Sequence, residues 1–224
     1  MISIPARPFN FEAPLNQIAL IVVDMQRDFL EVGGFGSSLG NDVERLRSII
    51  PSLLSLINTF RKYNAKIIYL KEGHKPDLSD CPNSKFRRGE NEYKIGDLGP
   101  LGRILINGEP GNQIIPELSP KIGEIIIEKP GKGGFYKTNL NEQLESLKIS
   151  HLIFSGVTTE VCVQSTMREA MDRGYETLVV EDATESYFAQ FKKSTLEMII
   201  SQGGIVGCIS NVATIMNSLE TRPI

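Results

Sequence analysis

The 224-residue sequence predicts a single α/β domain over residues 1–224, built on one doubly wound, mostly parallel six-stranded sheet with helices on both faces. Two observations support this fold class. Short, fully apolar runs recur along the chain, which is typical of strands buried on both faces of a parallel sheet. Between them lie longer stretches with apolar residues at every third or fourth position, which is typical of helices that pack one face on a sheet.

Six runs have the composition of buried strands. The first, Ile18–Val23, is apolar at every position, and we expect it in the interior of the sheet. A crevice should form at the carboxyl ends of the strands where the strand order reverses, with the first and fourth strands as neighbours across it. In chain order, the other runs are 67–70, 125–127, 152–154, 178–180 and a weaker run at 204–209.

Four stretches have helical periodicity. The longest, 41–63, carries one apolar face and is predicted as a helix. The stretch 163–171 repeats the pattern and precedes Gly174, a residue that suits the C-terminus of a helix. Shorter helices are predicted at 141–148 and 194–202.

The segment 73–111 interrupts this alternation. It is rich in Pro, Gly and charged residues, and it follows the carboxyl end of a predicted strand. It is also too long for a plain connection between two elements. Long loops at this position are commonly binding loops or lids, so we predict a long active-site loop. A surface insertion with no role in binding is the alternative.

Composition limits the chemistry. Lys and Arg total 24 and Asp and Glu total 27, a net charge of −3, so no basic surface is predicted to bind nucleic acid or an anionic membrane. We expect a soluble, cytoplasmic protein, because no apolar run is long enough for a membrane span or a signal peptide and the three cysteines form no disulfide framework. Two histidines leave little material for a His-rich metal centre.

A carboxylate and a lysine each stand at the end of a predicted strand. Asp24 follows the first strand directly and should look into the crevice, where partial desolvation raises the pKa of a carboxylate toward the range useful for proton transfer. Its alternative role is a turn or cap residue. Lys129 follows the third strand and can stabilise a thiolate or an oxyanion by its charge, or else be a surface lysine. The glycine-rich run after it, 130–134, lacks the spacing of a phosphate-binding loop.

Cys162 is the candidate nucleophile. The text of 154–162 indicates a strand, a tight turn and the start of a helix, with Thr158 and Thr159 as candidate N-caps. In the first turn of that helix, the helix dipole should lower the pKa of the thiol, and backbone N–H groups should offer an oxyanion site. The alternative is a buried structural cysteine.

Three segments of the chain resemble the hallmark segments of the isochorismatase-like cysteine hydrolases: 22–29, Lys129 and 155–163. The resemblance extends from about residue 7 to 219. It implies that Asp24 is the base, that Cys162 is the nucleophile and that Lys129 holds the pair in its charged form. The family also has a cis peptide bond before the position of Thr158, which would turn the amides of Thr158 and Cys162 toward the oxyanion.

Within the family, segments 71–80 and 202–204 are similar to the subgroup that hydrolyses biuret and related ureido amides. That likeness implies Gln202 as the side chain that orients a ureido carbonyl, with Phe29 and Thr158 as further substrate-binding residues. The metal-dependent nicotinamidase branch has an Asp-x-His after its second strand and another histidine nearby. Here the text at 72–74 is Glu-Gly-His and the other histidine is missing, so we predict no metal and no other cofactor. His74 is then a substrate-loop residue or, by preference, a structural one.

The resemblance implies hydrolysis of a small linear ureido or amide compound, with release of ammonia, through a covalent intermediate on Cys162. A biuret-like substrate is predicted first, and a ureidoacrylate or an N-carbamoyl amino acid is the alternative. Arg87 or Arg88 could hold a substrate carboxylate or simply be solvated. A non-catalytic binding protein with the same fold is a further alternative. A homo-oligomer, most often a tetramer in this family, is also expected.

Overall fold

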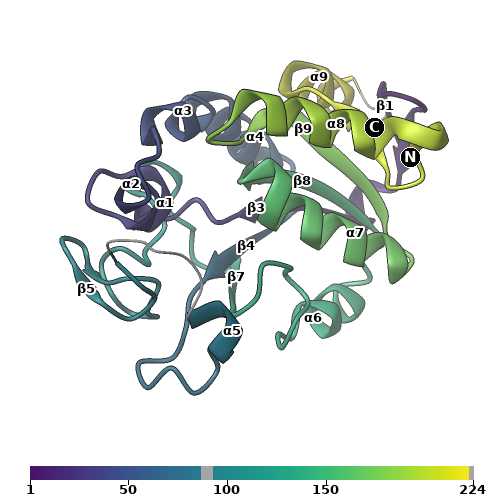
Figure 1. The fold of residues 1–224 in the computed structure, drawn as a ribbon. Helices are drawn as coiled ribbons and strands as arrows, with labels where there is room; N and C mark the ends of the chain where they lie inside the picture. Colours follow the sequence, from purple (N-terminus) through teal and green to yellow (C-terminus); the bar gives the residue numbers. More distant parts are fainter. Residues whose placement is uncertain (87–92, 222–224) are drawn as a thin grey trace.

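A parallel six-stranded sheet forms the centre of the protein (Figure 1). This computed structural model describes residues 1–86 and 93–221. All six predicted strands are present, and each pairs in parallel with its neighbours. In spatial order they are β10 (Cys208–Ser210), β9 (Glu176–Glu185), β8 (His151–Val157), β3 (Ile18–Val23), β4 (Lys66–Glu72) and β7 (Ile125–Lys129).

The strand order reverses next to β3, as the sequence predicts. From β3 the chain adds β4 and then β7 on one side, and afterwards β8, β9 and β10 on the other. In the β3–β8 pair, Val23 lies opposite Gly156, so the two strands end at the same level. Residues that follow these strands therefore meet at the topological switch point, where α/β sheets of this kind bind ligands.

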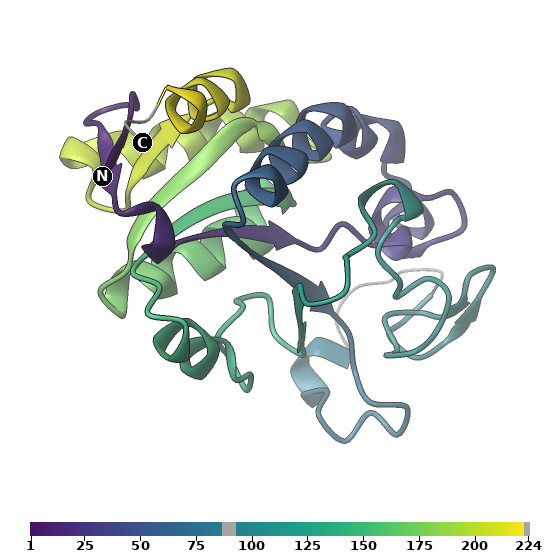
Figure 2. The same ribbon diagram turned by 180° about the vertical axis from the view of Figure 1, so that it is seen from behind.

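Helices cover both faces of the sheet (Figures 1 and 2). β3 shows why: its residues alternate between two apolar cores, with Leu20 in one and Ile21 in the other. The helices of the first core are α4 (Ile50–Lys62) and α9 (Val212–Glu220), and those of the second are α6 (Leu140–Ser146), α7 (Gln164–Asp172) and α8 (Ala189–Gly204).

The helix predicted at 41–63 is in fact two helices, α3 (Val43–Arg47) and α4. The reason is Pro51, whose ring would clash with the carbonyl four residues earlier in a continuous helix but fits the first turn of a new one. α8 begins before the predicted 194–202 and has a non-helical kink over 201–203. The sequence analysis did not predict α9.

The described parts of segment 73–111 are ordered around a small core of their own. Ile95, Ile104 and Leu105 are buried there. The segment contains α5 (Asn83–Phe86) and the two short strands β5 (Leu98–Gly99) and β6 (Gly102–Arg103) (Figure 1). Its apolar cluster argues against a surface insertion without packing.

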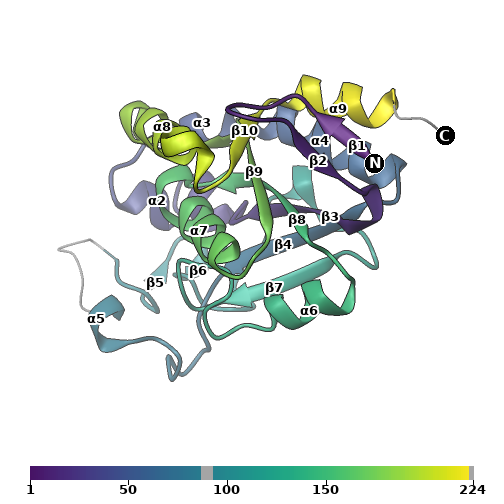
Figure 3. The ribbon, with the colours of Figure 1, turned by 90° about the vertical axis from the view of Figure 1, so that its right-hand side faces the viewer.

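At the N-terminus, β1 (Ile2–Ile4) and β2 (Phe11–Ala13) form an antiparallel pair, and β1 packs beside α9 (Figure 3). The short helices α1 (Arg27–Leu30) and α2 (Phe35–Ser38) follow β3. No helix in the described part of the chain combines the length and apolarity needed to cross a membrane.

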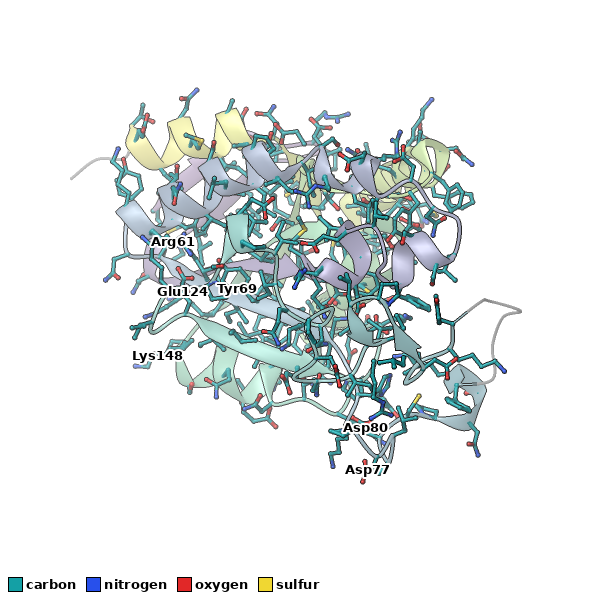
Figure 4. All side chains as sticks on the ribbon, turned by 90° about the vertical axis from the view of Figure 1, so that its left-hand side faces the viewer. Arg61, Tyr69, Asp77, Asp80, Glu124 and Lys148 are labelled. Carbon is teal, nitrogen blue, oxygen red and sulfur yellow. The ribbon has the colours of Figure 1, made fainter. Side chains whose placement is uncertain are left out.

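A bidentate ion pair joins the end of α4 to the start of β7. Arg61 donates from Nε to Glu124 Oε1 at 2.7 Å and from Nη2 to Oε2 at 2.9 Å, and its Nη2 is 3.3 Å from the Tyr69 hydroxyl. Figure 4 shows these three residues together, away from Asp77 and Asp80 in the 73–111 segment.

Candidate active site

The ends of three adjacent strands bring three ionisable side chains together. Asp24 follows β3, Glu72 ends β4 and Lys129 ends β7. In the β4–β7 ladder, Glu72 is the direct partner of Lys129. The Asp24 backbone N–H donates to Leu70 O on β4 at 2.9 Å, which fixes the carboxylate beside the same ladder.

Asp24 and Lys129 form a buried ion pair. Lys129 Nζ is 2.9 Å from Asp24 Oδ2, and both side chains are at most 2% exposed. The second oxygen of Asp24 accepts from the Glu72 backbone N–H at 3.0 Å, and Lys129 Nζ also donates to Gly131 O at 3.2 Å. A buried pair needs such additional hydrogen bonds to offset the cost of desolvation. The family resemblance implies that Lys129 acts on Asp24, and the structure places the two side chains in contact.

Cys162 completes this group from β8. Its Sγ lies within 4.8 Å of carboxylate oxygens of both Asp24 and Glu72, and 3.6 Å from Glu72 Oε2. The residue sits in a π-helical turn, Thr159–Val163, that leads into α7. Such turns are rare and frequently occur at functional sites.

The start of this turn differs in part from the prediction. Thr158 occupies the N-cap position, but its side chain makes no capping hydrogen bond, and the Thr159 hydroxyl bonds to Thr184 Oγ1 at 2.9 Å instead. Neither threonine is therefore a side-chain cap, and the hydroxyl of Thr159 is engaged by Thr184 on β9. The Val157–Thr158 bond is cis, as the family resemblance implies.

The pKa of the Cys162 thiol is raised well above its usual range, mainly by burial and then by the charge of Asp24. The expectation of a lowered thiol pKa is therefore wrong for this site without substrate, since burial outweighs the opposing charge of Lys129. Burial also raises the pKa of Asp24, against the charge of Lys129. The resting site therefore holds a protonated thiol beside a potential base.

Glu72 is the main site residue that the sequence analysis missed. It is fully buried and lies near three ammonium groups: Lys85 Nζ and Lys132 Nζ are 2.7 and 2.8 Å from its Oε1, and Lys129 Nζ is 3.8 Å from its Oε2. These charges outweigh burial and hold the pKa of Glu72 well below its usual range. Its place at a strand end beside Asp24 was the signal that could have found it.

A cavity of about 180 Å³ opens above these side chains. Asp24, Glu72 and Cys162 line it, and so do Phe29 and Thr158, two of the residues predicted to bind substrate. The sequence analysis did not predict the walls away from the strand ends, which include Phe35, Leu39, Asn41, Glu160, Val161 and Tyr187.

Gln202 lies elsewhere. It is exposed, has a left-handed φ of 54° in the kink of α8, and precedes β10, so it stands toward the amino ends of the strands rather than the carboxyl ends. The predicted role of Gln202 is thus wrong for the cavity that one chain forms. The cause is the course of α8, which carries the chain away from the cavity before the kink.

The described parts of 73–111 reach the site through one side chain. Lys85 on α5 contacts Glu72, donates to Pro130 O at 2.7 Å and lies 2.9 Å from His74 Nε2. Because lysine only donates, Nε2 accepts and the other ring nitrogen faces Asp80 at 3.3 Å. His74 is fully buried and bonded on both sides, which agrees with the structural role. No described residue of 73–111 lines the cavity, so a lid formed by this part is not observed; Arg87 and Arg88 lie outside the described residues.

Asp24, Glu72 and Cys162 could in principle offer three ligand atoms to a metal ion. Their environment does not suit a cation. Lys129 and Lys132 already pair with the two carboxylates, so an ion placed there would face buried or half-buried ammonium groups.

The sequence matches a known protein family and is similar to curated members of that family. The model of the family described as "Isochorismatase domain" matches residues 18–210. The chain is 32% identical over 224 residues to the ureidoacrylate amidohydrolase RutB of Klebsiella pneumoniae (98% of this chain, 94% of the relative). It is 33% identical over 219 residues to the protein of the same name from Yersinia enterocolitica (96% and 94%).

Solved structures share the fold. A cysteine hydrolase from Pseudomonas syringae superposes with a TM-score of 0.80 at 22% identity, covering 94% of this chain and 96% of the other. An N-carbamoylsarcosine amidase from Thermoplasma acidophilum gives 0.66 at 23% identity, covering 88% and 96%. From the family match and the relatives above 30% identity, we conclude that the chain belongs to the isochorismatase family of hydrolases.

Proposed function

We propose that the protein is a cysteine-dependent amidohydrolase that cleaves a small linear ureido or amide compound and releases ammonia. One observation carries the proposal: the buried Asp24–Lys129 ion pair and the Cys162 thiol meet in a single cavity at the switch point of the sheet. Nucleophile, base and orienting charge are the parts that covalent catalysis by a cysteine requires.

The first half of the reaction forms an acyl-enzyme. The Cys162 thiol proton passes to Asp24 while the sulfur attacks the substrate carbonyl carbon. The carbon–nitrogen bond then breaks, Asp24 returns its proton to the departing nitrogen, and ammonia leaves. The acyl group remains on the sulfur of Cys162.

The second half restores the enzyme. Asp24 takes a proton from water, the water oxygen attacks the same carbonyl, and the carbon–sulfur bond breaks. The proton returns to the sulfur and the acid product departs. In both halves, the backbone amides of Thr158 and Cys162 are proposed to hold the oxyanion, and Lys129 keeps Asp24 oriented.

A biuret-like substrate is our first candidate. The cavity is small and mostly apolar away from the strand ends, and the described residues that line it include no arginine to anchor a carboxylate. A ureidoacrylate or N-carbamoyl amino acid is the second candidate, favoured by the relatives named as ureidoacrylate amidohydrolases. Lys132, whose side chain is 45% exposed, is the cation in the described cavity wall that could meet a carboxylate.

Ammonia release from a panel of biuret, triuret, ureidoacrylate, N-carbamoylglycine and nicotinamide tests the proposal. We expect activity with ureido compounds and none above background in Cys162→Ala. Mass spectrometry of quenched wild-type enzyme should show an acyl adduct on Cys162. Full activity in Cys162→Ala, or ammonia from nicotinamide alone, would contradict the proposal. Binding of ureido compounds without ammonia release would instead support the non-catalytic alternative.

We further propose that the protein is cytoplasmic, acts on a small-molecule amide without nucleic acid or membrane as partner, and forms a homo-oligomer. Support for the oligomer comes from large exposed apolar side chains on α8.

A further inference from the structure

The cavity wall contains an acid that the mechanism does not use. Glu160 lies in the same π-helical turn as Cys162 and lines the cavity. Its Oε2 atom is fully buried, yet it has no hydrogen-bond partner among the described residues. A buried carboxylate oxygen without a partner has lost its hydration and gained no hydrogen bond in return, so its retention in a binding cavity indicates a partner that arrives with the ligand.

Glu160 stands at the opposite end of the site from the lysines. Its carboxyl group interacts with Ser186 and Glu185, which follow and end β9, whereas Glu72 and Lys132 belong to the β4–β7 side. Tyr187 also lines this end, but its hydroxyl donates to Phe29 O at 2.7 Å and is thereby engaged. Cys162, in the turn that follows β8, lies between the two ends.

A substrate that reacts at Cys162 therefore extends one end toward Glu160. The acceptor at that end, Glu160 Oε2, suits an N–H donor such as a terminal amide or urea nitrogen. A carboxylate at the same place would add a third negative group beside Glu160 and Glu185. Among the described residues, the cations near that end, Arg45 and Lys192, each pair with Glu185 at 3.0 Å, and neither lines the cavity.

We propose that Glu160 is the specificity-determining residue of this site: it accepts a hydrogen bond from the terminal nitrogen of a neutral ureido amide and disfavours substrates that end in a carboxylate. This inference rests on the proposed function and narrows its substrate class to the biuret-like group.

The test compares kcat and KM for ammonia release from biuret and from N-carbamoylglycine, which carry a terminal amide and a carboxylate respectively. Glu160→Met removes the acceptor at similar size, and Glu160→Lys reverses its charge. The matched controls are Glu197→Met and Glu197→Lys, at an acid on α8 whose side chain is 65% exposed.

We expect wild-type enzyme to prefer biuret. In Glu160→Met, kcat/KM for biuret should fall roughly 10- to 100-fold, mostly through KM, as for the loss of one hydrogen bond to a charged acceptor. Glu160→Lys should lower the preference for biuret further and raise kcat/KM for N-carbamoylglycine. The Glu197 variants should keep the wild-type ratio.

An unchanged substrate ratio in folded Glu160 variants would overturn the inference while leaving the proposed function intact. So would a wild-type preference for N-carbamoylglycine, a result that needs no variant to fold. By contrast, wild-type enzyme without activity on any ureido compound, or full activity in Cys162→Ala, would show that the proposed function itself is wrong.

Discussion

The protonation of Asp24 and Cys162 decides whether the site is ready for catalysis. Burial raises the pKa of both groups, and Lys129 lowers each of them by its charge. The negative charge of Glu72 raises both pKa values as well. Two further lysines, Lys85 and Lys132, pair with Glu72 and partly compensate its charge. The arrangement favours a thiol whose proton Asp24 removes at the moment of attack, rather than a preformed thiolate.

The first prediction concerns Asp24. Asp24→Asn should lower kcat about 10²- to 10⁴-fold, the usual contribution of a positioned base. In wild type, kcat/KM should fall as the pH is lowered through the pKa of Asp24, since only the carboxylate accepts the thiol proton. Burial places this acid limb above the ordinary range of aspartate. Glu72 cannot produce the limb, because its pKa is lowered. A pH–rate profile that stays flat down to the ordinary aspartate range would contradict the assignment.

The second prediction concerns Asp28, which is 1% exposed and accepts from the Leu105 backbone N–H at 3.0 Å. Burial raises its pKa from 3.8 to about 6. The folded state therefore binds more protons than the unfolded state between about pH 4 and 6, and stability falls as the pH rises through this window, by at most about 3 kcal/mol.

In Asp28→Asn this loss should disappear, so the difference in unfolding free energy between variant and wild type should move in favour of the variant as the pH rises from 4.5 to 7. Denaturant unfolding at several pH values measures it. At any single pH, the difference in unfolding free energy also includes the changed contact with Leu105. The quantity to compare is therefore the slope of that difference against pH. Asp172→Asn, at an exposed residue on α7, is the matched control and should keep the wild-type slope.

The meeting of Asp24, Lys129 and Cys162 was predictable because each ends or follows a strand that the sequence displays as an apolar run. Asp24, Lys129 and Cys162 follow three strands whose carboxyl ends must meet. The ion pairs of Glu72 with Lys85 and Lys132 were not predictable, since they need side chains from two segments whose course no periodicity encodes. Gln202 was misplaced for the same reason: its helix was found, but its direction relative to the cavity was not.

At the scale of elements, the 73–111 segment contacts the site through the ion pair between Lys85 and Glu72. Lys85 joins α5 to the ends of β4 and β7 through Glu72 and Pro130, and to the start of its own segment through His74. A lysine with three such contacts and a side chain only 18% exposed anchors the segment as well as balancing charge.

The third prediction follows from this anchor. Lys85→Met should leave the Pro130 carbonyl and His74 Nε2 without their donor and cost about 2 kcal/mol of stability. Proteolysis and hydrogen exchange within 73–86 should increase more than elsewhere. Lys75→Met, at an exposed lysine of the same segment, should change neither. Equal protection of 73–86 in both variants would show that Lys85 does not anchor the segment.

Element boundaries were less predictable than element types. The apolar face of 41–63 runs through both α3 and α4, so periodicity alone reads one helix, and only Pro51 signals the break. The cavity wall formed by α1 and α2 was not predictable from the sequence, because these helices are too short to produce a periodic pattern. Its side chains are placed instead by local contacts, such as the bond from Tyr187 Oη to Phe29 O.

At the scale of the whole molecule, α8 leaves an apolar stripe uncovered. Phe188 at the N-cap, Phe191 and Met198 are spaced by three and seven residues ahead of the kink, so they share one side of the helix. Each is 44–46% exposed, and the two phenylalanine rings lie 5.0 Å apart. A row of large exposed apolar side chains on one helix is typical of an interaction surface.

The fourth prediction is that this α8 stripe holds copies of the chain together in a homo-oligomer. Phe191→Lys with Met198→Glu places charges on the stripe without touching the cavity or either core, so the double variant should fold but have a lower mass than wild type in light scattering after gel filtration. Ile122→Lys, at a fully exposed apolar residue in the turn before β7, should leave the mass unchanged. A monomeric wild type at micromolar concentration would rule out a stable assembly, and a double variant of unchanged mass would move the interface away from α8. Because α8 begins two residues after Tyr187 in the cavity wall, an interface there would also place a neighbouring copy close to the end of the site where Glu160 lies.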